Sequence, residues 1–157
     1  MKTLPSAADV IDLLRANKQT LAIAESLTGG GLGAAITSVP GASDVFLGGV
    51  IAYSAQAKES ILKVEREKIE KYGVVSEEVA IAMAVGARHL FGSTWGISTT
   101  GVAGPGDAGG VRAGTVWIAI SGPVNQSTQL EVDGEREVVR TASLSSAISA
   151  FARILGL

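Results

Sequence analysis

The stretch Ile23-Ala24-Glu25-Ser26-Leu27-Thr28-Gly29-Gly30-Gly31-Leu32-Gly33-Ala34-Ala35 decides how the rest of the chain is interpreted. An apolar run ends at Glu25 and Ser26, a glycine cluster follows, and an apolar pattern of helical spacing begins at Leu32. This order predicts a strand, a tight turn and the N-terminus of a helix. Glycines let another group approach the main chain closely, and the first N–H groups of a helix lack partners within the helix. With the hydroxyls of Ser26 and Thr28 beside them, these donors suit a phosphate cradle or an acyl-transfer site.

The composition is that of a globular protein without thiol chemistry. The 157 residues are 46% hydrophobic and 18% charged, which suits a single α/β domain over residues 1–157. A net charge of −2 without a basic run argues against nucleic-acid binding. The absence of cysteine excludes thiolate zinc sites and a cysteine nucleophile, and the single histidine cannot supply a His-rich metal site. Because the sequence has no signal core and no membrane-spanning stretch, we expect a soluble cytoplasmic protein; a homo-oligomer stays open.

The order of predicted elements indicates the fold class. Apolar spacing and capping residues predict helices from a Ser6 cap to Asn17, over 30–39, 55–62 and 65–72, from a Ser76 cap to Gly92, and over 134–155. Strands are predicted over 19–25, 45–53, 95–100, 115–121 and 127–132, the last two as a hairpin. Strand–helix units come first and the hairpin late. We therefore expect an α/β protein, a three-layer α/β/α sandwich with a mixed, mostly parallel sheet.

Two alternative nucleotide-binding interpretations of the glycine cluster are weaker. Gly29 to Ala34 fits the dinucleotide pattern G-x-G-x-x-A between a strand and a helix. That motif needs an acidic residue after the second strand, but the predicted strand ends at Tyr53-Ser54. A Walker P-loop is excluded because the chain has no Gly-Lys pair. A dinucleotide-dependent reductase is therefore the less favoured hypothesis.

A serine nucleophile in this chain needs a base other than histidine or cysteine. Tyr53 and Lys58 lie where the second predicted strand passes into a helix, and the carboxyl ends of parallel strands converge at one edge of a sheet, where Ser26 also lies. A lysine whose pKa is lowered by burial can act as the base, and Tyr53 could relay the proton or orient Lys58. From the residues alone, a solvated surface lysine is an equally good interpretation. The spacing S-x-x-K at Ser60–Lys63 lacks its companion motifs and is taken as chance.

A second glycine-rich loop and a late arginine complete the candidate site. Residues 99–106 form a glycine-rich strand exit that can turn N–H groups toward an anion. Arg140 continues an apolar helical stripe, so its charge needs a partner. That partner is either a carboxylate such as Glu25 or a bound phosphate, and Arg136, one turn earlier, can share the role.

Five motifs follow one another between residues 20 and 140, and their order is more specific than any one of them. They are Ala24–Gly30, Tyr53–Lys58, Gly73–Ala80, Thr100–Gly106 and Gly114–Trp117. Together they resemble the CinA C-terminal-domain family, whose PncC-type members are nicotinamide-nucleotide amidohydrolases. Longer CinA proteins carry an additional N-terminal domain, for which we see no room in this chain. We therefore expect the stand-alone form.

The resemblance implies hydrolysis of the carboxamide of nicotinamide mononucleotide (NMN) to nicotinic acid mononucleotide and ammonia, through a serine acyl-enzyme and without metal or cofactor. Matched position by position, it implies Ser26 as nucleophile with Lys58 and Tyr53 as its catalytic partners. Backbone N–H groups near Gly29 and Gly30 are expected to stabilise the oxyanion. The substrate-binding residues are expected to be Thr28, Gly29, Gly30, Thr100, Gly101, Gly104 and Arg140. A nucleotide-binding module without turnover is the alternative from another class.

Overall fold

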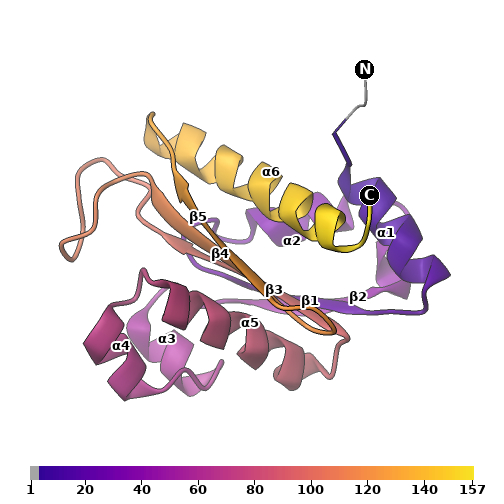
Figure 1. Cartoon of the computed structure of the whole chain (residues 1–157), viewed down its shortest axis with the longest axis horizontal. Helices are drawn as coiled ribbons and strands as arrows, with labels where there is room; N and C mark the ends of the chain where they lie inside the picture. The colour runs from indigo at the N-terminus through magenta and orange to yellow at the C-terminus, as the bar shows by residue number, and fades with distance from the viewer. Residues whose placement is uncertain (1–3) are drawn as a thin grey trace.

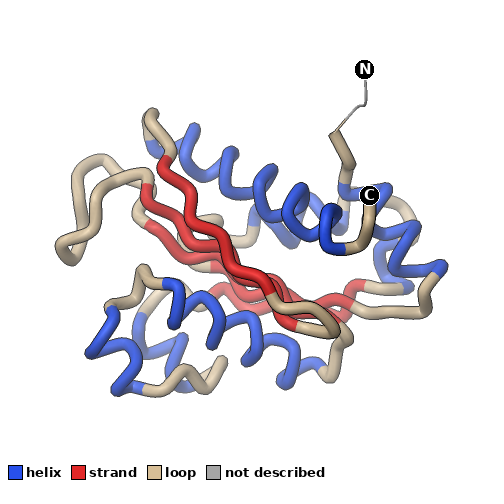
Figure 2. Tube along the Cα trace, viewed as in Figure 1, coloured by secondary structure: helices blue, strands red, loops and turns tan. Residues whose placement is uncertain are grey.

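The structure is a computed structural model that describes residues 4–157, a five-stranded sheet with helices on both faces (Figures 1 and 2). The strands are β1 (Leu21–Glu25), β2 (Phe46–Ile51), β3 (Trp95–Gly101), β4 (Thr115–Ser121) and β5 (Gln126–Glu131). The helices are α1 (Ala7–Ala16), α2 (Gly31–Thr37), α3 (Ala55–Ser60), α4 (Arg66–Tyr72), α5 (Glu77–Phe91), α6 (Arg136–Ile154) and the short 3-10 helix η1 (Ala42–Asp44). In Figure 1, α1, α2 and α6 cover one face and α3, α4 and α5 the other.

The sheet confirms the predicted fold class. Its strand order is β2-β1-β3-β4-β5. β1 is parallel to both of its neighbours, β2 and β3, whereas β4 is antiparallel to both β3 and β5. Only β4 therefore runs against the other four strands, and the sheet is mixed and mostly parallel by direction. The carboxyl ends of β1, β2 and β3 meet at one edge, the usual place for a site in such a sheet.

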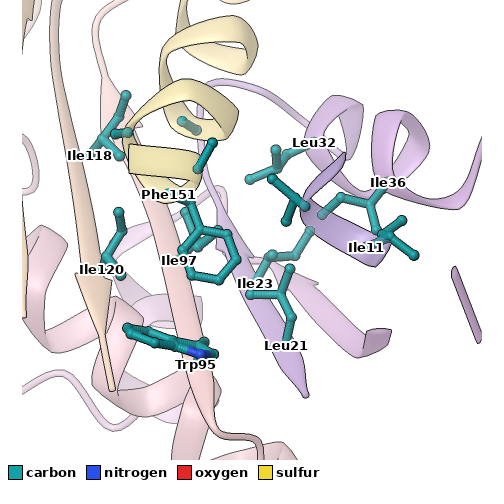
Figure 3. Close-up of a cluster of buried hydrophobic side chains, with 14 of the residues drawn as sticks. Ile11, Leu21, Ile23, Leu32, Ile36, Trp95, Ile97, Ile118, Ile120 and Phe151 are labelled. Carbon is teal, nitrogen blue, oxygen red and sulfur yellow. The ribbon is translucent and has the colours of Figure 1, made fainter. Parts of the chain in front are cut away.

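The apolar run of β1 is buried on both faces, as the central strand of a parallel unit requires. On the α1, α2 and α6 face, Ile23 belongs to a core that also includes Ile97 and Phe151 (Figure 3). On the other face, Ala22 and Ala24 pack with Met83 of α5. The small side chains on that face let α5 lie close to the sheet, so the strand that precedes Ser26 is fixed from both sides.

Several helix ends lie where capping residues in the sequence predicted them. Ser6 and Asp9 form the expected capping box of α1. Ser76 caps α5 through the Val79 N–H, and Gly92 ends that helix in the left-handed conformation. The glycine pair Gly48-Gly49 of β2 lies at a bulge and at a close approach to β1. The β1–β2 register indeed shifts after Phe46, and the side chain of Ile23 fills the space where Gly49 would carry a Cβ.

Candidate active site

The carboxyl edge of the sheet opens into a cavity of about 640 Å³, beside Ser26 at the end of β1. This volume lies within the range of small-molecule sites. The walls come from the β2–α3 connection, the segment between α4 and α5, the β3–β4 loop and the start of α6. The lining residues include Ser26, Leu27, Tyr53, Lys58, Thr100, Gly101, Gly104 and Arg136.

Ser26 and Lys58 form a buried pair, as the sequence predicted. Ser54 caps α3 directly after β2, which places Lys58 inside the first turns of that helix. Its Nζ donates to Ser26 Oγ at 2.9 Å and to the carbonyl oxygen of Ala52 at 2.8 Å. Lys58 is only 2% exposed, and burial lowers the pKa of its amine to about 8. At pH 7 about a tenth of such amines are neutral and able to accept a proton.

Tyr53 lies on the cavity rim rather than against this pair. Its side chain is 62% exposed, and its hydroxyl accepts a hydrogen bond from Arg136 Nη2 at 3.1 Å. Arg136 Nη1 also donates to the carbonyl oxygen of Gly104 at 2.6 Å. The guanidinium therefore joins the β2–α3 connection to the β3–β4 loop. In this geometry the Tyr53 hydroxyl contacts Arg136 rather than Lys58, and the expectation that Tyr53 relays the proton or orients Lys58 stays a prediction.

The residues that follow Leu27 build a turn and do not line the cavity. Thr28 is buried and its Oγ1 shares a 2.8 Å hydrogen bond with Thr99 Oγ1. The Gly29 N–H donates to the Ser26 carbonyl oxygen at 3.0 Å. Gly29 and Gly30 have φ values of +58° and +100°, which only glycine adopts without strain. These residues shape the turn that presents Ser26, and the expected substrate-binding role of Thr28, Gly29 and Gly30 stays a prediction.

Glu25 ties the end of β1 to the start of α2. Its buried carboxylate accepts hydrogen bonds from the N–H groups of Leu32 at 2.8 Å and Gly33 at 3.0 Å. The carboxylate satisfies the helix N-terminus and is therefore not paired with Arg140; the carboxylate that Arg140 does pair with is that of Glu137, whose Oε2 lies 3.4 Å from Nη1. The sequence analysis missed Glu25 as a site residue. The available signal was a carboxylate at the end of an apolar strand, next to the candidate nucleophile.

Arg140 braces the nucleophile turn from α6. Its Nε donates to the Leu27 carbonyl oxygen at 3.1 Å, and its Nη2 donates to the Thr28 carbonyl oxygen at 3.3 Å. Its Nη1 also donates to Glu137 Oε2 at 3.4 Å, and Arg140 does not line the cavity. The expected substrate-binding role of Arg140 stays a prediction, for which the structure shows no contact with the cavity. Arg136, one helical turn earlier, is the arginine of α6 that reaches the cavity.

The β3–β4 loop lies where the sequence analysis placed it. Thr100, Gly101 and Gly104 all line the cavity. The Thr100 hydroxyl donates to the Val74 carbonyl oxygen at 2.8 Å. This hydrogen bond fixes the segment between α4 and α5, which forms one wall of the cavity. Among residues 4–157, no three His, Asp or Glu side chains gather as a metal site would need. Nor does any helix in that range have the length and hydropathy to cross a membrane.

Fold and site together define an α/β domain with a buried serine–lysine pair at the carboxyl edge of a mixed sheet. The profile of the CinA C-terminal domain family matches residues 4–155, and the chain belongs to this family. A CinA-like protein from Synechococcus sp. (strain RCC307) is 52% identical over 118 residues, which are 74% of this chain and 28% of the relative. One from Nostoc punctiforme is 42% identical over 155 residues, 95% of this chain and 37% of the relative. The chain thus spans about a third of the length of these curated relatives.

Solved structures of the family share the fold. A CinA superfamily protein from Klebsiella pneumoniae 700603 superposes with a TM-score of 0.92 at 30% identity, over 96% of this chain and 95% of that one. The competence/damage inducible protein CihA from Agrobacterium tumefaciens gives 0.90 at 27% identity over the whole of both chains. Both matches cover the elements that form the cavity.

Proposed function

We propose that this domain hydrolyses the carboxamide of nicotinamide mononucleotide to nicotinic acid mononucleotide and ammonia through a serine acyl-enzyme. The observation that carries the proposal is the buried Ser26–Lys58 pair, with 2.9 Å between Oγ and Nζ, at the wall of a cavity of small-molecule size. A lysine with a pKa of about 8 is a base suited to activating a serine. The family resemblance supports the choice of a nicotinamide nucleotide as substrate.

Acylation begins with the neutral amine of Lys58. The amine accepts the proton of the Ser26 hydroxyl as Oγ bonds to the carboxamide carbon, and the carbonyl oxygen becomes an oxyanion. The N–H of Leu27, the main-chain donor directly after the nucleophile, is our candidate for stabilising that oxyanion, because Leu27 lines the cavity. The Lys58 ammonium then returns the proton to the amide nitrogen, the C–N bond breaks, and ammonia leaves.

Deacylation repeats the proton transfers with water. Lys58 takes a proton from water, whose oxygen attacks the acyl carbon, and then protonates Ser26 Oγ as the ester bond breaks. Throughout both steps the carbonyl oxygen of Ala52 accepts a hydrogen bond from Lys58 Nζ. This contact keeps the amine aimed at Ser26 in either protonation state, since the neutral amine retains two N–H donors.

Arg136 is our candidate for the group that binds the substrate phosphate. It is the guanidinium that lines the cavity, and a planar guanidinium suits phosphate oxygens. Its present partners are a carbonyl oxygen and a phenolic hydroxyl, both neutral acceptors. A phosphate would form stronger, charge-assisted hydrogen bonds with it.

The test is an ammonia assay with nicotinamide mononucleotide. Ser26→Ala and Lys58→Met should each lower kcat by about three orders of magnitude or more. The chain supplies a matched control, since Ser60 and Lys63 have the same residue types at the surface of the α3 region. Ser60→Ala and Lys63→Met should keep the wild-type rate. A wild-type protein that binds the nucleotide without releasing ammonia would be a binding module, and full activity of Ser26→Ala would contradict the mechanism.

A further inference from the structure

One polar side chain of the cavity wall has no part in the chemistry proposed above. Asp107 belongs to the β3–β4 loop and lines the same cavity as Ser26. Its Oδ1 accepts a hydrogen bond from the Ala113 N–H at 2.8 Å, across the loop. Within residues 4–157 its Oδ2 accepts no hydrogen bond. The carboxylate is therefore held in place through one oxygen, while the other oxygen is free to contact a ligand.

The other hydrogen-bond acceptors among the side chains of the wall are less suited to a ligand. The Thr100 hydroxyl donates to a carbonyl oxygen at 2.8 Å, and the Tyr53 hydroxyl accepts from a guanidinium at 3.1 Å. Tyr72 also lines the cavity, but its phenolic hydroxyl is a weaker acceptor than an ionised carboxylate. The side chain of the wall that can best accept hydrogen bonds from a ligand is therefore that of Asp107.

The charge of Asp107 narrows the kind of ligand group that it can bind. Among the described residues that line the cavity, Asp107 is the one carboxylate, whereas Lys58 and Arg136 are basic. A carboxylate repels a phosphate group, but it accepts short and strong hydrogen bonds from hydroxyl groups and attracts cations. A nicotinamide nucleotide contains both kinds of group, namely the hydroxyls of its ribose and its cationic ring.

The order of the groups along the nucleotide favours the ribose. In the proposed reaction the carboxamide of the ring is attacked by Ser26 and the phosphate lies at Arg136, so the ribose lies between them. Arg136 Nη1 donates to the Gly104 carbonyl oxygen at 2.6 Å, and Asp107 follows Gly104 closely in the same loop. The carboxylate therefore lies on the side of the cavity that would hold the sugar and the phosphate.

We propose that Asp107 binds the sugar of the substrate, its carboxylate accepting hydrogen bonds from the vicinal hydroxyl groups of a ribose. A carboxylate has about four lone-pair sites, which leaves room for two hydroxyl donors besides the Ala113 N–H. This role rests on the proposed function and deepens it, because it makes the site selective for ribosylated carboxamides over simpler ones. Asp107 takes no part in bond making or proton transfer.

The test is the affinity for three ligands, measured by calorimetry on Ser26→Ala protein so that no turnover occurs. The ligands are nicotinamide mononucleotide, nicotinamide riboside and 1-methylnicotinamide, with weak binding measured by competition. All three contain the cationic ring and the carboxamide, but 1-methylnicotinamide has no ribose. Asp107→Ala, added to this protein, should weaken binding of the nucleotide and of the riboside about tenfold each. Its affinity for 1-methylnicotinamide should stay within about twofold.

Two further variants separate the sugar contact from the fold of the loop. Asp107→Asn keeps a carbonyl oxygen for the Ala113 N–H and loses the charge, so it should weaken the same two ligands, by about threefold or more. Asp133→Ala is the matched control. The side chain of Asp133 is 98% exposed, lies 3.5 Å from Arg112 and does not line the cavity. This variant should bind all three ligands as the parent does.

The outcomes distinguish this role from the proposed function. Equal losses for all three ligands in Asp107→Ala would assign the carboxylate to the cationic ring and overturn the proposal. Unchanged binding of the nucleotide would overturn it as well. The proposed function fails separately, if wild-type protein binds the nucleotide and releases no ammonia, and a selective loss of the two ribosides would then still support the role of Asp107. A protein that binds none of the three ligands overturns both.

Discussion

The burial of Lys58 without a charged partner determines the pKa of its amine. Its amine is almost fully buried beside Ser26, with hydrogen bonds to Oγ and to the Ala52 carbonyl oxygen. Neither partner carries a negative charge, so nothing offsets the loss of hydration of the ammonium form, and the pKa falls to about 8. A partner carboxylate would have raised the pKa and removed the base. In the proposed mechanism, the neutral surroundings of Lys58 would therefore favour proton transfer from Ser26.

The pH dependence of hydrolysis should report this amine. Because the base must be neutral, kcat/KM should rise about tenfold per pH unit below a pKa of about 8 and become constant above it. The measurement is best made above pH 7, where the substrate phosphate has completed its second ionisation near pH 6. Lys63→Met should keep the wild-type profile. A profile that is flat from pH 7 to 9 would contradict the assignment of Lys58 as base.

At the scale of the elements, α6 carries two arginines one turn apart with different tasks. Arg136 reaches the cavity and its rim, whereas Arg140 holds the carbonyl oxygens of Leu27 and Thr28. The helix therefore contacts both the cavity and the rear of the turn that carries Ser26. A contact with substrate and a contact with the turn should affect different kinetic constants.

The two arginines should be separable by substitution. Arg136→Ala removes a cation from the cavity and should raise KM for nicotinamide mononucleotide about tenfold or more, with a smaller effect on kcat. Arg140→Ala removes two hydrogen bonds behind Ser26 and should lower kcat about tenfold or more with little change in KM. Steady-state kinetics with ammonia detection checks both, and Arg153→Ala, in the last turn of the same helix, serves as control. The reverse assignment of the two effects would contradict the geometry.

Element types and their order could be predicted from the sequence because their signals are local. Ser6 and Ser76 mark helix starts, Gly92 marks an end, and Leu21–Ala24 reads as a buried strand. Each of these signals acts within a few residues of its position in the chain. The predicted boundaries are accordingly close to those of the structure.

The division of tasks within the site could not be predicted in the same way. Arg136 and Arg140 lie one turn apart in the predicted helix, so the sequence allows either of them to reach the cavity. Only the packing of α6 against the sheet decides which one does. The same holds for Tyr53, whose partner Arg136 lies 83 residues away. The turn glycines are ambiguous for a related reason, because a glycine pattern does not tell whether the N–H of Gly29 faces a ligand or the Ser26 carbonyl oxygen.

At the scale of the whole molecule, the buried lysine should lower the stability of the protein at neutral pH. The pKa is about 8 in the folded chain and 10.5 as its ordinary value, a difference that corresponds to about 3 kcal/mol. Below pH 8 the Lys58 amine is protonated in both the folded and the unfolded chain, and burial of the ammonium lowers the free energy of unfolding by this full amount. Between pH 8 and 10.5 the unfolded state binds more protons, so the stability of the wild type rises with pH. Above pH 10.5 the amine is neutral in both states, so burial of Lys58 no longer lowers the free energy of unfolding.

Lys58→Met should therefore stabilise the inactive protein at pH 7, by about 1–2 kcal/mol after the loss of two hydrogen bonds is subtracted. The advantage over the wild type should shrink as the pH is raised from 8 to 10. Urea denaturation at pH 7 and pH 10 measures both values. The exposed Lys63→Met serves as the control and should show no such pH-dependent difference. A Lys58→Met protein that is less stable than the wild type at pH 7 would contradict this account.

The contacts of α6 also bear on how the protein is made. The chain leaves the ribosome from its N-terminus, so the residues of β1 and α3, with Ser26 and Lys58, are synthesised well before those of α6. The turn at Leu27 is held by Arg140, which lies 113 positions later in the chain, so this contact forms only after α6 has been synthesised. Contacts of such long sequence separation form late, because the intervening loop has to be closed first. Nascent chains therefore carry Ser26 and Lys58 without the brace, and under the proposed function the full rate of amide hydrolysis would require that synthesis and folding of this domain are complete.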